Sequence, residues 1–177
     1  MHIMFYYLGL CDEYSAKQLM CGCAEGDDVI AVMTKYFLDN TKDDVIIISC
    51  DKDMVQLYND RVSIVTADGT IRTPKDELEH AIKTKISGNI SANDFLLFKI
   101  LIGDSSDGIP NVKNGIGPKK AYKYVSDRNE LKKLLKEDIT IADSFLRNKR
   151  LISMQEIPKE IHTLILEEFN KEDKLDV

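Results

Sequence analysis

Four consecutive β-branched residues, Val45 to Ile48, constrain the fold more than any other segment of this chain. The run has no polar alternation, and continuous apolar strands of this kind belong to parallel sheets that are covered on both faces. We therefore expect a strand over residues 45–49 that is buried on both sides. The strands lie mostly in the first half of the chain and helical patterns fill the second half. This order predicts an α/β fold that passes into an all-helical C-terminal region.

Local signals divide the rest of the chain into expected elements. Asp27 is expected to cap a helix that ends near residue 40, Asp68-Gly69 predicts a hairpin, and Ser91 is expected to cap an apolar helix. Helices are expected over 1–10, 53–58, 74–86, 95–102, 118–125, 130–135, 141–150 and 158–169, and short strands over 16–21, 62–66 and 71–73. We predict two parts, an α/β core over residues 1–90 and a helical region over residues 91–177.

Composition excludes several classes of protein. The chain has 177 residues, of which 44% are hydrophobic, which is enough to bury a core without disulfides. It has no apolar run of the ~18 residues that a membrane span needs and no recognisable secretory leader, so no membrane partner is expected. Its four cysteines are too sparse for a disulfide scaffold. These features favour a cytoplasmic protein with reduced thiols.

Acidic residues gather in three short clusters, each at one end of a strongly apolar element. The first starts a helix, the second follows the buried strand and the third follows the apolar helix. They supply seven carboxylates: Glu25, Asp27, Asp28, Asp51, Asp53, Asp104 and Asp107. One such cluster alone is better explained as a helix cap or a solvated turn. Because ligands bind beyond the carboxyl ends of strands in open α/β sheets, the three together favour a shared site.

A shared site of this kind has to bind cations. At ~6 Å and an effective dielectric constant of ~20, each pair of carboxylates repels by about 3 kcal/mol. Hard divalent cations such as Mg²⁺ accept oxygen ligands, and two of them ~3.5–4 Å apart can promote phosphodiester hydrolysis. Removing the seven residues from the 30 acids leaves 23 against 24 bases, so the rest of the chain is close to neutral. That balance suits a DNA-binding protein whose acids are neutralised by metal.

A glycine-containing loop with lysines follows the third acidic cluster. Gly115 and Gly117 allow the backbone to approach a ligand just before a helix that starts at Pro118, and a helix N-terminus offers N–H groups to a phosphate. Four lysines add positive charge: Lys113, Lys119, Lys120 and Lys123. The alternative is a connecting turn with solvated lysines. The position of the loop after the acids favours a clamp on the phosphate backbone. Scattered histidines and the single Cys21-Gly22-Cys23 pair do not predict a zinc site.

These motifs, taken in order, resemble the 5′-nuclease superfamily, which includes flap endonucleases, the 5′-nuclease domain of bacterial DNA polymerase I, and phage 5′–3′ exonucleases with a phage ribonuclease H. The family pattern E-A-D-D corresponds to residues 25–28, and S-x-D-K-D corresponds to residues 49–53, followed by Gln56-Leu57. The pattern G-D-S-S-D-N-I-P corresponds to residues 103–110, with Gly108 in the place of Asn, and G-I-G-P-K corresponds to residues 115–119. The resemblance covers about residues 20–126.

The resemblance implies a divalent-metal 5′–3′ exonuclease or structure-specific flap endonuclease with a PIN-like core. Its substrate would be the 5′ end or flap of duplex DNA or RNA–DNA. It would act in replication or primer removal, in a bacterial or phage-infected cell, and its protein partners would be replication proteins. Two Mg²⁺ ions are expected, with Mn²⁺ as a substitute. One ion would face Glu25, Asp27 and Asp28, and the other would face the four remaining acids. The glycine loop would be the family's helix–three-turn–helix (helix-hairpin-helix) clamp, which also holds K⁺.

Two departures from the family pattern shape the remaining expectations. Asn111 stands where glycine is usual, and one extra residue precedes Gly115. The family also has a strand with a metal-binding Asp, a second metal Asp and a basic helical arch before the glutamate motif. Only 24 residues precede Glu25, and none of these features can be identified in them. We therefore expect an N-terminally incomplete core that cleaves poorly alone. The alternatives are a catalytically weak structure-specific DNA-binding fragment and a subunit that needs a separate N-terminal polypeptide.

Overall fold

A computed structural model describes residues 17–171, so the helix expected over residues 1–10 lies outside the described part. The strand expected over residues 16–21 is wrong for its described part, because residues 17–21 have no regular structure. The Cys21 carbonyl instead accepts a hydrogen bond from the Ala24 N–H, which turns the chain toward the first described helix. Met20 is 61% exposed, so the packing of its side chain does not hold this segment extended.

A three-stranded sheet forms in the order β1 (Val45–Ile48), β2 (Val62–Val65) and β3 (Ile71–Arg72). Strands β1 and β2 are parallel, with Val45 opposite Val62. Strands β2 and β3 are antiparallel, and the turn between them has Gly69 at φ 85°, where glycine is favoured. The hairpin expected around Asp68-Gly69 is therefore confirmed, and so is a sheet with a parallel pair.

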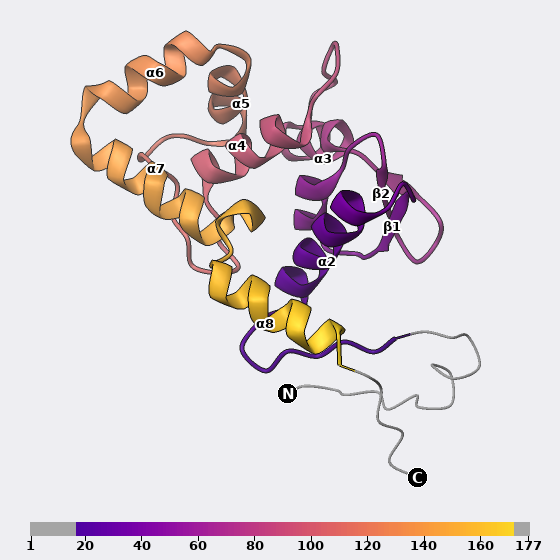
Figure 1. The fold of residues 1–177 in the computed structure, drawn as a ribbon. Helices are drawn as coiled ribbons and strands as arrows, with labels where there is room; N and C mark the ends of the chain where they lie inside the picture. The colour runs from indigo at the N-terminus through magenta and orange to yellow at the C-terminus, as the bar shows by residue number, and fades with distance from the viewer. Residues whose placement is uncertain (1–16, 172–177) are drawn as a thin grey trace.

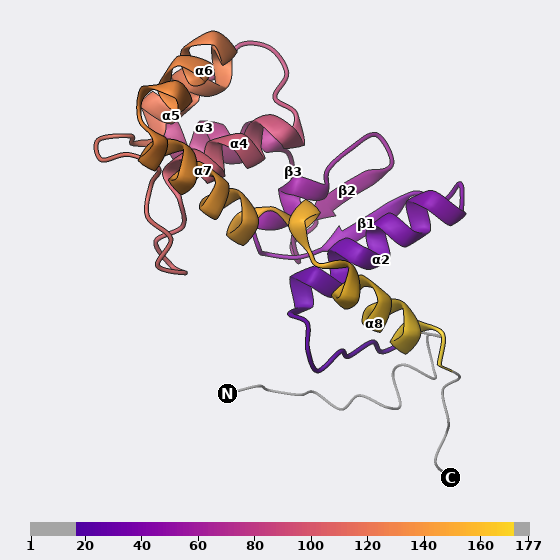
Figure 2. The same cartoon turned by 60° about the vertical axis from the view of Figure 1, so that its left-hand side comes forward.

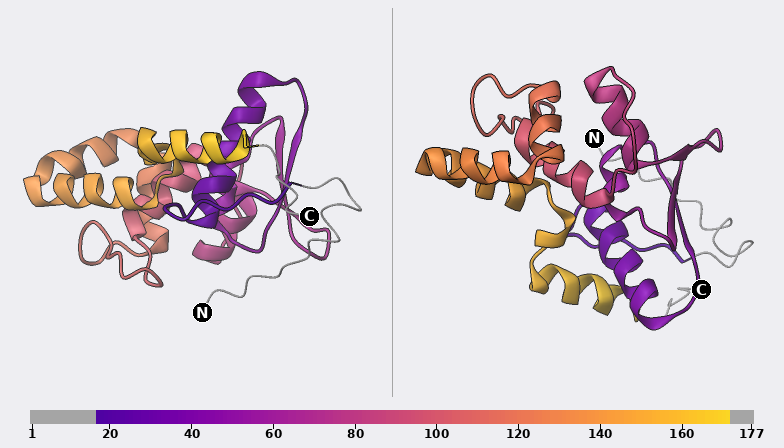
Figure 3. Two further views of the ribbon diagram at one scale, coloured as in Figure 1. Left: turned by 60° about the horizontal axis from the view of Figure 1, so that its bottom comes forward. Right: turned by 90° about the horizontal axis from the view of Figure 1, so that it is seen from above.

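Strand β1 has exposed side chains on one of its faces, so the expectation that it is buried on both sides is wrong. Ile47 is 6% exposed, whereas Ile46 and Ile48 are 67% and 73% exposed. Successive side chains of a strand point to opposite faces, which places Ile46 and Ile48 together on the uncovered face. Helix α2 (Gly26–Asn40) contacts β1 and lies along one side of the sheet (Figure 3). Among residues 17–171, β2 is the only strand that pairs with β1.

Helices make up most of the remaining structure, and their order agrees with the mixed α/β class expected. They are η1 (Asp53–Leu57), α3 (Pro74–Ile82), α4 (Ala92–Ile102), α5 (Pro118–Ser126), α6 (Arg128–Glu137), α7 (Ile139–Ile152), η2 (Met154–Glu156) and α8 (Lys159–Phe169). Ser91 caps α4 as expected, through its side chain and the Asp94 N–H. The cap of α2 is Glu25 and not Asp27. Helix α3 ends at Ile82, short of residue 86, because Lys83 adopts a left-handed conformation with φ 55°.

Within residues 17–171, buried hydrophobic side chains form two clusters. The smaller one lies under the sheet and includes Ile47, Met54 and Ile64. The larger one joins helices α3 to α7 and includes the fully buried Leu78 and Leu101. Figures 1 and 2 show α5, α6 and α7 grouped on one side of α4, with the sheet, α2 and α8 on the other.

The position of the domain boundary at residue 90 stays a prediction, and α3, which precedes it, packs into the larger helical cluster. Helix α8 packs against α2, with the Tyr36 and Phe169 rings 5.3 Å apart. Within residues 17–171, no helix has both the length and the apolar character that crossing a membrane would require.

Candidate functional site

The second acidic cluster lies directly after β1, where it forms a tight local turn. The Ser49 hydroxyl accepts a hydrogen bond from the Asp51 N–H (3.0 Å), and Asp51 Oδ1 accepts one from the Asp53 N–H (2.8 Å). Asp53 then begins η1. These bonds leave Asp51 exposed and turn Asp53 toward the interior, where its side chain is 26% exposed.

The third acidic cluster lies in a loop that closes immediately after α4. Gly103 has φ 73°, and a Cβ added there would lie 2.2 Å from the Ile109 carbonyl oxygen, so only glycine fits. The Asp104 N–H donates to the Ile109 carbonyl (2.8 Å), and the Ile109 N–H donates back to the Asp104 carbonyl (2.7 Å). This closure turns the Asp104 side chain inward, while Asp107 stays exposed.

Lys99 joins the two clusters. Its Nζ lies 2.6 Å from Asp104 Oδ2 and 3.0 Å from Asp53 Oδ1, and its side chain is only 15% exposed. The lysine comes from α4, so one cation links the end of the sheet to the loop after the helix. The sequence analysis missed this residue. Its signal was a single charge within the apolar run of residues 95–102, a position where an unpaired lysine would be costly.

The charged groups in this cluster shift one another's pKa values. Burial raises the pKa of Asp53, the Lys99 ammonium lowers it, and the Asp51 and Asp104 carboxylates raise it further; the net shift is upward. Burial also raises the pKa of Asp104, but hydrogen bonds from Lys99 and Ser106 outweigh it and hold that pKa at about 2. Burial lowers the pKa of Lys99, and its two carboxylate partners more than reverse the effect. Asp104 and Lys99 are therefore a charged pair near neutral pH.

The donor atoms in this cluster suit a hard divalent cation. Asp53 Oδ1 is buried and lies within ion-pair distance of Lys99, yet it accepts no hydrogen bond. Such an oxygen is an available ligand, and Mg²⁺ commonly takes one or two carboxylates together with water. Within residues 17–171, no group of three or more His, Cys, Asp or Glu side chains lies close enough to hold a metal ion. The carboxylate oxygens are therefore suitable ligands for a divalent ion, but they do not surround one completely.

The first acidic cluster is used locally, at the start of α2. The Glu25 N–H donates to Asp28 Oδ2 (3.2 Å), and the Asp28 N–H donates to Asp27 Oδ1 (2.9 Å). These bonds satisfy helix N–H groups that would otherwise lack partners. Within residues 17–171, the side-chain hydrogen bonds of this cluster stay inside it and do not reach the other two clusters. The gathering of all seven carboxylates at one site therefore stays a prediction.

The glycine loop leads into the N-terminus of α5. Gly115 has φ 81°, and Gly117 occupies the N-cap position without a side chain to cap the helix. Lys119, Lys120 and Lys123 are exposed on α5. Lys113 pairs with Glu137 at 2.7 Å. Asn111, which stands where the family pattern has glycine, donates from its side chain to the Ile116 carbonyl (3.3 Å) and so braces the turn.

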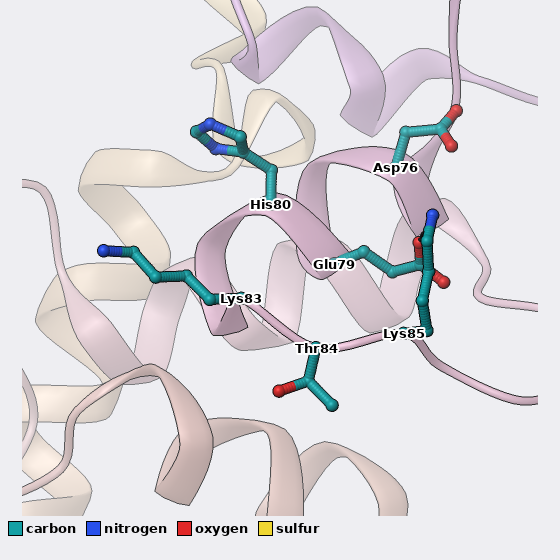
Figure 4. Close-up of a pocket in the computed structure, with 6 residues that line it drawn as sticks. All are labelled: Asp76, Glu79, His80, Lys83, Thr84 and Lys85. Carbon is teal, nitrogen blue, oxygen red and sulfur yellow. Dashed lines mark hydrogen bonds and ion pairs between the residues drawn. The ribbon is translucent and has the colours of Figure 1, made fainter.

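A separate pocket at the C-terminal end of α3 contains none of the candidate carboxylates. Six residues line it: Asp76, Glu79, His80, Lys83, Thr84 and Lys85. Glu79 pairs with Lys85 at 2.7 Å and accepts the Ile86 N–H at 2.8 Å. Figure 4 shows His80 and Lys83 pointing to one side of the helix and Glu79 and Lys85 to the other. Because these polar groups do not converge, the pocket is a poor candidate for the functional site.

Comparison with known proteins identifies relatives for most of the chain. Residues 6–86 match the family model described as 5′-3′ exonuclease, N-terminal resolvase-like domain. The chain is 33% identical over 125 residues to a thermostable DNA polymerase I of Thermus filiformis, which covers 71% of this chain and 14% of that protein. It is 30% identical over 145 residues to a 5′-3′ exonuclease of Buchnera aphidicola, which covers 81% of this chain and 47% of that protein. The chain thus spans less than half the length of these relatives.

Solved structures with a similar fold include two of bacteriophage T5 proteins. A T5 flap endonuclease in a complex with DNA and metal ions is 22% identical with a TM-score of 0.63, covering 93% of this chain and 66% of that chain. A T5 5′-exonuclease mutant is 23% identical with a TM-score of 0.60, covering 81% of this chain and 65% of that chain. These likenesses establish the fold, and the sequence matches point to the same group of proteins. The chain belongs to the 5′-nuclease superfamily.

Proposed function

We propose that this chain is part of a divalent-metal-dependent 5′–3′ exonuclease or flap endonuclease that acts on the 5′ ends of duplex DNA or RNA–DNA. The observation that carries the proposal is the meeting of Asp53 and Asp104 at Lys99, which brings two of the family's acidic motifs together. The relatives support this proposal, because they are named as 5′-3′ exonucleases, DNA polymerases I and a flap endonuclease in a complex with DNA and metal ions.

In this proposal the carboxylates hold two Mg²⁺ ions, for which Mn²⁺ can substitute. Asp51, Asp53, Asp104 and Asp107 would face one ion, and Glu25, Asp27 and Asp28 would face the other. Bound ions of this kind polarise the scissile phosphate and lower the pKa of a water molecule. The protein's own contribution is to keep Asp104 ionised and oriented: Lys99 lowers the pKa of this carboxyl, and the closed loop after Gly103 fixes its direction.

The glycine loop and α5 would grip the DNA backbone in the manner of a helix–three-turn–helix clamp. The uncapped N-terminus of α5 offers N–H groups to a phosphate, and the lysines add charge without sequence preference. The proposed contacts are Gly115, Gly117, Lys113, Lys119, Lys120 and Lys123. A K⁺ ion at the turn and replication proteins as partners belong to the same proposal.

A clamp variant tests the DNA-binding half of this function. Lys119→Ala with Lys120→Ala should weaken binding to every duplex sequence and lower the salt slope by up to about 2. Fluorescence anisotropy at several salt concentrations measures both quantities. Lys75→Ala, which removes a lysine from α3, is the matched control and should leave the slope unchanged. An unchanged salt slope in the clamp variant would show that these lysines lie on a solvated helix face and do not contact phosphate.

One alternative has a specific observation in its favour. Ile46 and Ile48 are exposed on β1, whose second edge pairs with no strand among residues 17–171. A subunit that needs another polypeptide to complete the sheet would present such a face. Anisotropy and gel cleavage on one 5′-flap substrate in Mg²⁺ separate the cases. Weak cleavage by this chain that is lost in Asp51→Asn with Asp104→Asn supports the nuclease, and binding without any detectable cleavage supports the alternative.

A further inference from the structure

The segment formed by α7 and η2 contacts both acid-bearing segments, although its sequence shows only a helical pattern. Helix α7 packs against α4, which carries Lys99 and leads into Asp104. Met154 of η2 packs against the hydrophobic cluster under the sheet, close to the chain that follows β1. The segment therefore spans the two clusters of the molecule, and two side-chain amides form its polar contacts with them.

Asn148 is the first of these amides and is fully buried in α7. Its Nδ2 group donates to the Ile100 carbonyl (3.0 Å) and to the Pro110 carbonyl (2.7 Å). Arg147 donates two hydrogen bonds to Asn148 Oδ1, at 3.1 and 2.9 Å, so every polar atom of the amide has a partner. The two carbonyls lie on either side of the loop that holds Asp104.

The Ile100 carbonyl needs this partner because of how α4 ends. In a longer helix it would accept the N–H of residue 104, four positions on. The Asp104 N–H instead donates to the Ile109 carbonyl when the loop closes. Asn148 takes the place of the missing donor, and the Val112 N–H satisfies the neighbouring Leu101 carbonyl (3.1 Å). The direction of the Asp104 loop therefore depends on α7.

Gln56 is the second amide, and it comes from η1, which begins at Asp53. Its Nε2 donates to the Ile152 carbonyl (3.1 Å), and its Oε1 accepts the Met154 N–H (3.3 Å). The amide thus links the acid-bearing turn after β1 to the junction of α7 and η2. Asn148 and this junction lie about one helical turn apart, so the two amides attach both acidic segments to one short, rigid piece of chain.

We propose that Asn148 and Gln56 are positioning residues that set the separation of Asp53 and Asp104 and thereby the affinity of the carboxylates for a divalent ion. The inference rests on the proposed function, since it concerns the same site. Residues that orient ligands without touching the metal commonly change metal affinity by about 10–100-fold when they are replaced. The side-chain amides of Asn148 and Gln56 bond backbone groups and not the carboxylates of Asp53 or Asp104, so they act through the backbone that carries these acids.

Mn²⁺ binding to the full chain tests this inference without an activity assay. Asn148→Leu and Gln56→Met keep the approximate size of each side chain and remove its hydrogen bonds. We expect each variant to bind Mn²⁺ about 10-fold more weakly or worse, as measured by calorimetry well below its melting temperature. Gln56 is only half-buried, so its variant is expected to fold even where the Asn148 variant does not. Circular dichroism checks the fold of both.

Arg61→Met is the matched control. Arg61 also bonds backbone carbonyls, those of Leu38 and Thr41, but away from the acids, so its loss should lower the melting temperature and leave the Mn²⁺ affinity unchanged. An affinity equal to that of the parent in folded Gln56→Met would overturn the inference and leave the proposed function standing. A parent chain that binds no Mn²⁺ would overturn both.

Discussion

Two acidic regions of this molecule look alike in sequence and behave differently in the structure. The acidic side chains of residues 25–28 form their hydrogen bonds within four residues, at the start of α2. Asp53 and Asp104 come from separate segments and share Lys99, a partly buried cation on a third. Helix capping accounts for the first arrangement without any ligand. Capping does not account for the second, which brings like charges together and leaves Asp53 Oδ1 without a hydrogen bond.

Replacement of Lys99 is expected to have the largest effect on stability. Lys99→Met leaves Asp53 and Asp104 facing each other without a cation. We expect a loss of about 1–3 kcal/mol in urea unfolding, less than the ~3–5 kcal/mol for breaking a fully buried pair, because both carboxylates are partly exposed. Mg²⁺ should restore part of this loss. A variant as stable as the parent without metal would show that Lys99 does not hold the cluster together.

Single Asp replacements sharpen the comparison of the two regions. Asp104→Asn should remove the tighter of two Mn²⁺ binding events, because its carboxylate is already oriented by Lys99 and the closed loop. Asp28→Asn should remove only a weaker event, since a metal there competes with the helix cap, and should cost up to about 1 kcal/mol through the cap. Electron paramagnetic resonance counts bound Mn²⁺. Loss of the tighter binding event in Asp28→Asn would mean that the higher-affinity metal site lies at residues 25–28 and not at Asp53 and Asp104.

Local features of this fold could be predicted from the sequence, and long-range ones could not. The Ser91 cap and the Asp68-Gly69 hairpin depend on neighbours within a few residues. The pairs made by Lys99 and the amide contacts of Asn148 depend on elements that meet only after folding. Ile46 and Ile48 were wrongly predicted to be buried for the same reason. A run of β-branched residues indicates a strand but does not say which of its faces a helix will cover.

The pair between Glu79 and Lys85 is the smallest test and serves as a contrast to Lys99. Lys85 is 93% exposed, whereas Lys99 is 15% exposed. The Ile86 N–H and then Lys85 lower the pKa of Glu79. A lowered pKa stabilises the folded state above the unfolded pKa of ~4.3, and this stability is lost as the pH falls through the folded pKa. The melting temperature of Glu79→Gln should therefore lie slightly below that of the parent at pH 6 and converge with it as the pH falls below the lowered folded pKa of Glu79. A difference in melting temperature that does not change with pH would show that the ionisation of Glu79 is not its cause.

The central claim is that the acids after β1 and after α4 form one divalent-ion site. Melting temperature with and without Mg²⁺ or Mn²⁺ tests it most directly, because an ion that binds only the folded state stabilises that state. At a free metal concentration of about 100 times the Kd, the parent should melt about 5–10 °C higher. Asp51→Asn with Asp104→Asn should remove most of that rise and leave only the smaller contribution of an ion at the first acidic cluster. A rise of equal size in the double variant would contradict the claim.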